Sequence, residues 1–163
     1  IKILKSRGVK LLIHQPSYSL LNRWIEKDLT KTLINNGVGC IAFSPLAQGF
    51  LSNKYLSGIP KGTRVSENSS FDKSLITKSN TRIINDLNLI AKKRGQSLSQ
   101  MALAWVLNNK AVTSALIGVR TTQQLKENIE ALKNLKFSKS ELTEISKKAR
   151  EGNINLWSPS SAH

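Results

Sequence analysis

The chain has 163 residues, about one ordinary domain, and its 39% apolar and 21% charged residues are typical of a globular protein. No stretch approaches the roughly 18 apolar residues of a membrane-spanning helix, and no basic start leads into an apolar run as in a signal peptide. The single Cys40 excludes an internal disulfide and a cysteine-based metal cluster. We therefore expect a cytoplasmic protein without a membrane span or a metal site.

The balance of charge is strongly basic, since 25 basic and 10 acidic residues give +15. Such a surface is one feature of proteins that bind nucleic acids, because it attracts the phosphate backbone. Here the basic residues are spread along the whole chain rather than gathered in one block, and few aromatic residues accompany them that could stack on bases. The pattern favours a general excess of basic surface residues over a nucleic-acid-binding site, and we expect no nucleic-acid partner.

The first part of the chain alternates between helix and strand. Residues 1–7 have the pattern of the end of an amphipathic helix, which Gly8 closes, and this suggests that further sequence precedes the chain. Residues 10–14 form a short apolar run typical of a buried strand. Apolar residues at helical spacing predict a helix over 22–36, and a second apolar strand is predicted over 38–43.

The second part begins with a long loop. Residues 47–73 are rich in glycine and serine and predict an ordered, functional loop with one short helical turn. A helix is expected over 75–94, and Ser97 with Gln100 forms a capping box for a helix over 98–109. After this come a third strand, two helices and an irregular tail, over residues 112–117, 121–133, 139–151 and 152–163. Ser138 with Glu141 forms a second capping box, for the helix over 139–151.

Short strands that are apolar on both faces and separated by helices indicate an α/β fold with a parallel sheet covered by helices. Three such strands with two open edges form a poor stand-alone sheet. They fit as a segment of an eight-stranded β/α barrel, the TIM barrel. We therefore expect residues 1–163 to form a single partial domain of such a barrel.

Polar or glycine-bearing segments follow each predicted strand, where β/α barrels place their functional groups. After the third strand, Gly118 allows a sharp turn and Thr121 or Thr122 can cap the next helix, whose N-terminus favours an anion. Arg120 adds a planar positive charge suited to phosphate. The alternative interpretation is an ordinary strand-to-helix turn with a solvated arginine.

Several segments in the same order resemble the aldo-keto reductases, in the branch that contains the potassium-channel β subunits and the bacterial L-glyceraldehyde 3-phosphate reductases. Residues 44–64, SPLAQGFLSNKYLSGIPKGTR, are similar to the S-P-L-A-x-G-x-L-x-x-K-Y segment after the seventh barrel strand. Residues 117–132 resemble the end of the eighth strand and its helix, and LIHQPSYSLLNRW and the tail NLWSPSS are also similar. The resemblance places the chain at the sixth to eighth strands, the C-terminal part of the barrel.

The resemblance implies a site for a nicotinamide dinucleotide. Gln15 would bind the carboxamide, Phe43 would lie beside the nicotinamide ring, and Lys54 would contact the pyrophosphate. Arg64 matches a basic position in a loop that covers the cofactor, where Gly62 replaces a tyrosine of the channel subunits. The expected cofactor-binding residues are Gln15, Phe43, Ser44, Pro45, Leu46, Ala47, Gln48, Gly49, Lys54, Arg64, Gly118, Arg120, Gln124, Glu127 and Asn128. Arg120 replaces a serine of many relatives and suits a 2′-phosphate, so we expect NADP(H).

The family reduces carbonyl groups with an Asp, Tyr, Lys and His tetrad on the second to fourth strands, so no catalytic residue is expected in this chain. His14 is interpreted as a packed polar residue at a strand end, and Tyr18 and Tyr55 do not match the catalytic tyrosine. The expected function is the cofactor-binding part of an NADP(H)-dependent reductase of aldehydes, with L-glyceraldehyde 3-phosphate among the candidates. The alternatives are an inactive nucleotide-binding or regulatory module and a degenerate gene fragment. Expected partners are a separate N-terminal chain or a second copy.

Overall fold

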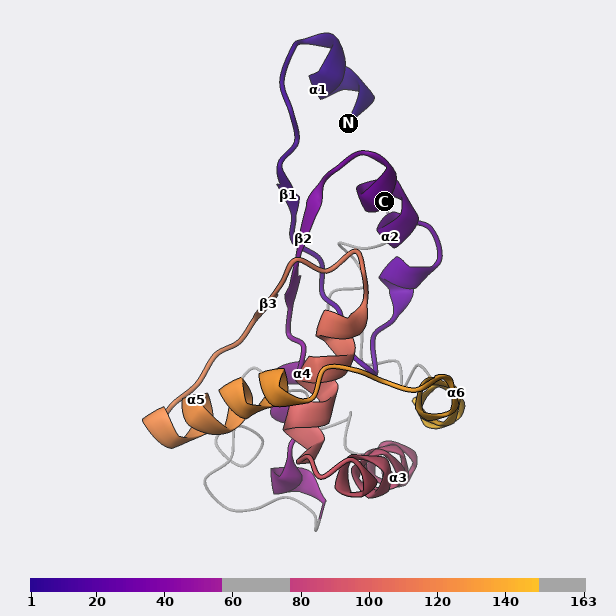
Figure 1. Cartoon of the computed structure of the whole chain (residues 1–163), viewed down its shortest axis with the longest axis vertical. Helices are drawn as coiled ribbons and strands as arrows, with labels where there is room; N and C mark the ends of the chain where they lie inside the picture. Colours follow the sequence, from indigo (N-terminus) through magenta and orange to yellow (C-terminus); the bar gives the residue numbers. More distant parts are fainter. Residues whose placement is uncertain (57–76, 150–163) are drawn as a thin grey trace.

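Three short parallel strands lie side by side in the order β1 (Ile13–His14), β2 (Gly39–Phe43) and β3 (Ser114–Leu116) (Figure 1). The computed structural model describes residues 1–56 and 77–149. Ile13 pairs with Gly39 in β2, and Ala42 of β2 pairs with Ala115 on its other side. The predicted parallel sheet is therefore confirmed, although β1 and β3 are shorter than the apolar runs that predicted them.

The helices agree with the predicted order and differ mainly at their ends. They are α1 (Lys2–Ser6), α2 (Leu29–Asn35), α3 (Lys78–Lys93), α4 (Leu98–Asn108), α5 (Thr122–Ile129) and α6 (Lys139–Lys148). Single 3₁₀ turns are η1 (Trp24–Glu26), η2 (Ala47–Gly49), η3 (Asn53–Tyr55) and η5 (Glu130–Lys133). Both predicted capping boxes form, at Ser97 with Gln100 and at Ser138 with Glu141, because each serine and its partner satisfy one another's backbone N–H groups.

Two sequence predictions change in the first part and in the long loop. The helix predicted over 22–36 is α-helical only over Leu29–Asn35, and the separate 3₁₀ turn η1 occupies Trp24–Glu26 before it. The described part of the predicted loop over 47–73 contains two helical turns instead of one. Its remainder, with Arg64, and the predicted tail over 152–163 lie outside the described residues.

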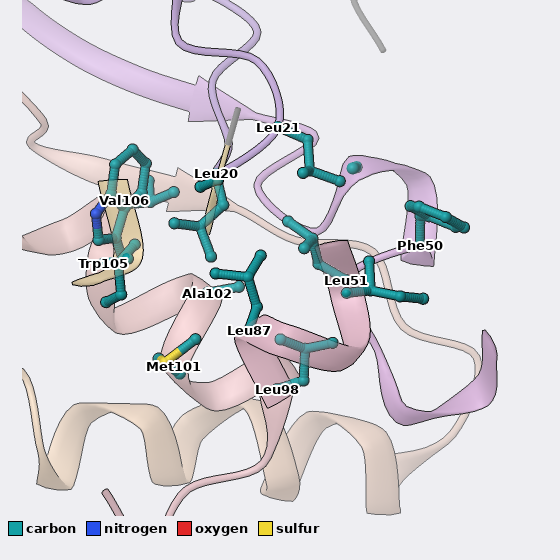
Figure 2. Close-up of a cluster of buried hydrophobic side chains, with 14 of the residues drawn as sticks. Leu20, Leu21, Phe50, Leu51, Leu87, Leu98, Met101, Ala102, Trp105 and Val106 are labelled. Carbon is teal, nitrogen blue, oxygen red and sulfur yellow. The ribbon is translucent and has the colours of Figure 1, made fainter. Parts of the chain in front are cut away.

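The core fills the space between one face of the sheet and the helices. Cys40 and Ala42, which alternate along β2, are fully buried, and so is nearly the whole of α4 from Met101 to Val106. Figure 2 shows the centre of this core, where Leu20 and Leu21 from the segment after β1 and Phe50 and Leu51 from the loop after β2 surround Leu87 of α3 and the apolar face of α4. Burying a large apolar side chain stabilises the folded state by about 1.5–3 kcal/mol. Because most of its side chains are buried, α4 is the central helix of the fold.

The opposite face of the sheet has a different environment. Residues that pair in a parallel sheet point to the same face, so Ile13, Ile41 and Leu116 share this face. Ile13 and Leu116 are each 52% exposed, and Ile41 is half-buried. Within the described residues, this apolar face of the strands is therefore less buried than the face that carries Cys40 and Ala42. The physical reason is that the described helices pack on the face of Cys40 and Ala42.

A buried polar network joins the segment after β1 to the end of α4. The Tyr18 hydroxyl donates to Glu26 Oε1 at 2.8 Å and accepts from Asn109 Nδ2 at 3.1 Å. Its ring lies 5.2 Å from that of Trp105, and the Arg23 guanidinium lies over the same indole while pairing with Glu26 at 2.8 Å. Burial raises the pKa of Tyr18 far above its ordinary value, so Tyr18 acts here as a neutral hydrogen-bonding group.

A second anchor connects the turn between α3 and α4 to α6. The Arg94 side chain is only 3% exposed, lies 3.6 Å from the centre of the Phe137 ring, and donates to Glu141 Oε1 at 2.6 Å. It also donates to Gln96 Oε1 and to the carbonyl oxygens of Asn134 and Lys136. The backbone N–H of Ser138 and, to a smaller extent, Arg94 lower the pKa of the Glu141 carboxyl.

This second anchor predicts a stability that depends on pH. Because the folded-state pKa of Glu141 is lowered, its contribution is present above the ordinary glutamate pKa of about 4.3 and is lost as pH falls through the lower folded-state value. Glu141→Gln is expected to reduce the free energy of unfolding near neutral pH by about 1–3 kcal/mol and to make its decline in acid shallower. Urea unfolding over a pH series measures both effects.

Glu144→Gln is the matched control for this substitution. Glu144 is on the same helix and pairs with Lys93 at 3.7 Å, but both side chains are well exposed. An exposed pair contributes about 0–1 kcal/mol, so this variant should stay close to the parent chain at every pH. Equal losses in the two variants would contradict the role given to Arg94 and Glu141.

Candidate functional site

A cavity of about 650 Å³ opens where β2 and β3 end. Its walls come from the loops that follow these two strands, from the start of α4 and from α5. The structure brings most of the predicted cofactor-binding residues together here: Phe43, Ser44, Pro45, Leu46, Gln48, Gly49, Lys54, Gly118, Arg120, Gln124, Glu127 and Asn128. Residues that are far apart in the sequence meet because parallel strands end at the same edge of the sheet.

The loop after β2 forms one wall with an unusual backbone. Ser44, Ala47 and Gln48 have φ values of 52°, 48° and 57°, in the left-handed region that side chains other than glycine rarely adopt. Gly49 follows at 96°. Such residues cost of order 1–3 kcal/mol each and persist only where the surroundings hold them. Here Phe50, which is fully buried, anchors the loop to the core.

Hydrogen bonds inside this loop hold its shape. The Ala47 N–H donates to the Ser44 carbonyl and the Gly49 N–H donates to the Leu46 carbonyl, both at 2.9 Å. The Ser52 hydroxyl closes the turn by donating to the Gly49 carbonyl at 2.6 Å. The loop is therefore a preformed wall, and strained backbone at the rim of a cavity is typical of binding sites.

Gln48 places a buried polar group on this wall. Its side-chain Oε1 is buried and has no hydrogen-bond partner in the described part of the chain. A buried acceptor without a partner costs about 1–3 kcal/mol, so such groups need a reason. Gln48 lines the cavity, and a bound molecule with a hydrogen-bond donor would satisfy it.

The turn from β3 into α5 forms the facing wall. Thr121 caps α5 by accepting from the Gln124 N–H at 3.2 Å, and Gln124 Oε1 accepts from the Arg120 N–H at 2.9 Å. These bonds fix the turn while the Arg120 side chain stays exposed at the cavity. The positive end of α5 and the Arg120 guanidinium together favour an anionic group at this wall.

Two predicted cofactor-binding residues, Gln15 and Ala47, do not line the cavity, and the place of a third is not described. Gln15 is exposed directly after β1, which is separated from β3 by β2, and it does not line the cavity. Ala47 is buried beneath the loop, 6% exposed, so its contribution is to shape the wall. Arg64 lies outside the described residues. His14, beside Gln15, is half-buried and pairs with Cys40 in the sheet.

The cavity also includes residues that the sequence analysis missed. Ser97 and Ser99 come from the start of α4, and Ser52, Asn53 and Tyr55 extend the loop after β2. The remaining ones are Leu116, Ile117 and Val119 at the end of β3. The Ser97 capping box located the start of α4 in the sequence. The position of this helix start beside the strand ends was not visible in the sequence, because it depends on packing between segments that are far apart in the chain.

Tyr18 is packed against Trp105 in the core and does not line this cavity. Among residues 1–56 and 77–149, no group of three or more His, Cys, Asp or Glu side chains is arranged to hold a metal ion. Within the same ranges, no helix combines the length and apolar character needed to span a membrane.

Comparisons with known proteins confirm the resemblance. The chain is 49% identical over 166 residues to the L-glyceraldehyde 3-phosphate reductase of Escherichia coli K12, covering 99% of this chain and 48% of that protein. It is 37% identical over 123 residues to a protein of Schizosaccharomyces pombe assigned as a voltage-gated potassium channel subunit beta, covering 72% of this chain and 36% of that one. The chain spans about half the length of the curated relatives it matches.

Solved structures confirm the predicted fold class. A glycerol dehydrogenase from Gluconobacter oxydans superposes with a TM-score of 0.72 at 25% identity, over 91% of this chain and 46% of its own. The holo form of an aldo-keto reductase from Bacillus halodurans superposes with a TM-score of 0.66 at 20% identity, over 91% and 47%. The three strands and their helices thus correspond to part of a β/α barrel.

The model of the aldo/keto reductase family matches residues 1–150, which is most of the chain, and this protein therefore belongs to the aldo/keto reductase family.

Proposed function

We propose that the cavity between the loop after β2 and the start of α5 binds NADP(H), and that the chain is the cofactor-binding part of a reductase of aldehydes. The observation that carries this proposal is the convergence of the two strand-end loops, Ser44–Gly49 and Gly118–Gln124, on one cavity. Its volume of about 650 Å³ is within the range of about 300–1,000 Å³ usual for cofactor sites.

The chemistry of the wall matches the parts of a dinucleotide. Phe43 offers an aromatic face for a planar ring, and Gln48 offers a buried amide for a polar group. Lys54 and the positive end of α5 offer positive charge for phosphates. Glu127 and Asn128 add polar side chains on the helix that carries Gln124. The wall thus offers an aromatic ring, polar side chains and positive charge. This combination supports a ligand with aromatic, polar and anionic parts.

Arg120 supports NADP(H) over NAD(H). Its backbone N–H is bound by Gln124, so the residue is fixed, while its guanidinium is exposed at the cavity. A guanidinium can make two parallel hydrogen bonds to a phosphate, which the 2′-phosphate of NADP(H) offers and the 2′-hydroxyl of NAD(H) does not.

The bound cofactor would supply a hydride to a carbonyl carbon, and the described residues would hold the cofactor and exclude water from it. The resemblance places the proton-donating tyrosine and its partners on earlier strands of the barrel. Tyr18 is no substitute, since it is 1% exposed and burial raises its pKa instead of lowering it. We therefore propose that reduction requires an N-terminal part, and that aldehydes such as L-glyceraldehyde 3-phosphate are substrates of the completed protein in the cytoplasm.

Arg120→Ala tests the choice of cofactor. We expect this variant to lose about tenfold or more in affinity for NADPH and to keep its affinity for NADH, because a charged hydrogen bond contributes about 1.5–3 kcal/mol. Titration of each cofactor by nucleotide fluorescence or calorimetry measures the difference. Arg82→Ala, which removes an exposed arginine of α3 away from the cavity, is the control and should bind like the parent chain. Equal losses for both cofactors would argue for a general loss of the site.

The pure chain is expected to show no NADPH-dependent reduction of L-glyceraldehyde 3-phosphate or of simple aldehydes, because the resemblance implies that the proton-donating tetrad belongs to strands other than β1, β2 and β3. Consumption of NADPH is followed by absorbance, with the E. coli reductase as the positive control. NADPH consumption faster than in a protein-free control would overturn the proposal that reduction requires an N-terminal part. If the chain alone binds NADPH as tightly as full-length relatives do, the alternative of an inactive nucleotide-binding module is favoured.

A further inference from the structure

We propose that Gln100 is a positioning residue of the cavity. Its side-chain amide joins the start of α4 to the last turn of α5, and it thereby holds two walls of the cavity at a fixed spacing. The role concerns how this cavity is kept in shape for its ligand, so it rests on the proposed function. Two hydrogen bonds of one amide group and the contrast between two capping boxes of the chain support it.

The acceptor half of the amide is bound at the start of α4. Gln100 Oε1 accepts from the Ser97 N–H at 2.9 Å, and the Ser97 hydroxyl accepts from the Gln100 N–H at 3.2 Å. The N–H groups at the start of a helix have no partner within the helix, so this reciprocal pair fixes where α4 begins. It also fixes the direction of the Gln100 side chain and keeps Ser97 and Ser99 at the cavity.

The donor half of the amide is bound by α5. Gln100 Nε2 donates to the Glu127 carbonyl oxygen at 3.0 Å. This carbonyl lies in the last turn of α5, where the carbonyl groups of a helix can accept from side chains of other elements. The two helices pack against each other (Figure 1), and the amide adds a directed link at their contact.

A second capping box in the same chain shows why the residue type at position 100 matters. At the start of α6 the Ser138 N–H donates to Glu141 Oε2 at 2.6 Å, so a carboxylate also completes this motif. An ionised carboxylate only accepts hydrogen bonds, whereas a glutamine amide both accepts and donates. A glutamate at position 100 could therefore complete the capping box but could not bind the Glu127 carbonyl. The link to α5 is the part of the arrangement that requires glutamine.

The linked walls surround the part of the cavity next to Arg120. The start of α4 and the helix α5 contribute Ser97, Ser99, Gln124, Glu127 and Asn128 to the lining. Arg120 is joined to α5, because its backbone N–H donates to Gln124 Oε1 at 2.9 Å. This bond is local to the turn and does not set the position of α5 relative to α4. A change in the spacing of the two helices would therefore shift Arg120 together with α5.

The alternative role for Gln100 is that of a helix cap alone. A carboxylate in the first turn of a helix is favoured by the helix dipole, so Gln100→Glu should preserve or strengthen the cap of α4. The same substitution removes the donor to the Glu127 carbonyl and places a carboxylate against it. A residue that only caps α4 predicts unchanged ligand affinity in this variant, whereas a residue that positions α5 predicts weaker binding.

Gln100→Glu in the 163-residue chain tests the positioning role. We expect NADPH to bind about three- to tenfold more weakly than to the parent chain, because a hydrogen bond between the two walls is replaced by repulsion. Adenosine 2′,5′-bisphosphate carries the adenosine and the 2′-phosphate of NADPH without the nicotinamide, and it should lose affinity by the same factor. Calorimetric titration of both nucleotides measures these changes.

Gln123→Glu is the matched control. Gln123 Nε2 donates to Glu127 Oε1 at 3.1 Å, both residues are exposed, and Gln123 does not line the cavity. This variant adds the same charge beside the same glutamate and leaves the link between α4 and α5 in place, so its NADPH affinity should stay within about twofold of the parent. Equal losses in the two variants would assign the effect to charge and overturn the proposal, as would parent-like affinity in Gln100→Glu.

Amide hydrogen exchange provides a second measurement that needs no nucleotide. We expect the amides of residues 123–133 to exchange at least about threefold faster in Gln100→Glu than in the parent chain, while those of α3 keep their rates, because α5 loses its link to α4. A parent chain that does not bind NADPH would contradict the proposed function, and the exchange rates would still decide whether Gln100 holds α5. Unchanged exchange in Gln100→Glu would overturn the positioning role.

Discussion

The pairing of β2 with a strand on each side is the constraint on which the rest of this structure depends. Because β2 lies between β1 and β3, its backbone groups are satisfied on both sides, and its buried face can carry residues as small as Cys40 and Ala42. The small side chains leave room for the large apolar residues of α4 and of the segments that follow β1 and β2. The core is thus built outward from the central strand, and the two outer strands gain their positions from it.

The candidate site follows from the same constraint. The loop after β2 and the turn after β3 face one another because the parallel strands that precede them end at one edge of the sheet. Strained backbone at Ser44, Ala47 and Gln48 is tolerated because the next residues, Phe50 and Leu51, are locked in the core. Packing in the core therefore supports the shape of the cavity wall.

Two polar anchors connect the helices to one another and to the segment after β1. Arg94 ties α3, α4 and α6 together through a buried pair with Glu141, and Tyr18 ties the segment after β1 to α4. Both anchors lie among the helices, and the polar groups of each are hydrogen-bonded to one another. The cavity lies at the strand ends, where the start of α4 and part of α5 contribute to its walls. The helix that fills the core therefore also helps to shape the cavity.

The amino-acid sequence by itself determined the order of the elements, the capping boxes at Ser97 and Ser138, the family and most residues of the cavity wall. These are local or motif-level features, because apolar spacing, capping residues and the S-P-L-A-Q-G segment depend only on neighbouring residues. Only the tertiary structure decided that Ser97 and Ser99 join the cavity, that Tyr18 lies in the core, and that Gln15 stays apart from it. It also decided that Ile13 and Leu116 are exposed, since burial of an apolar residue depends on what packs against it and not on the residue itself.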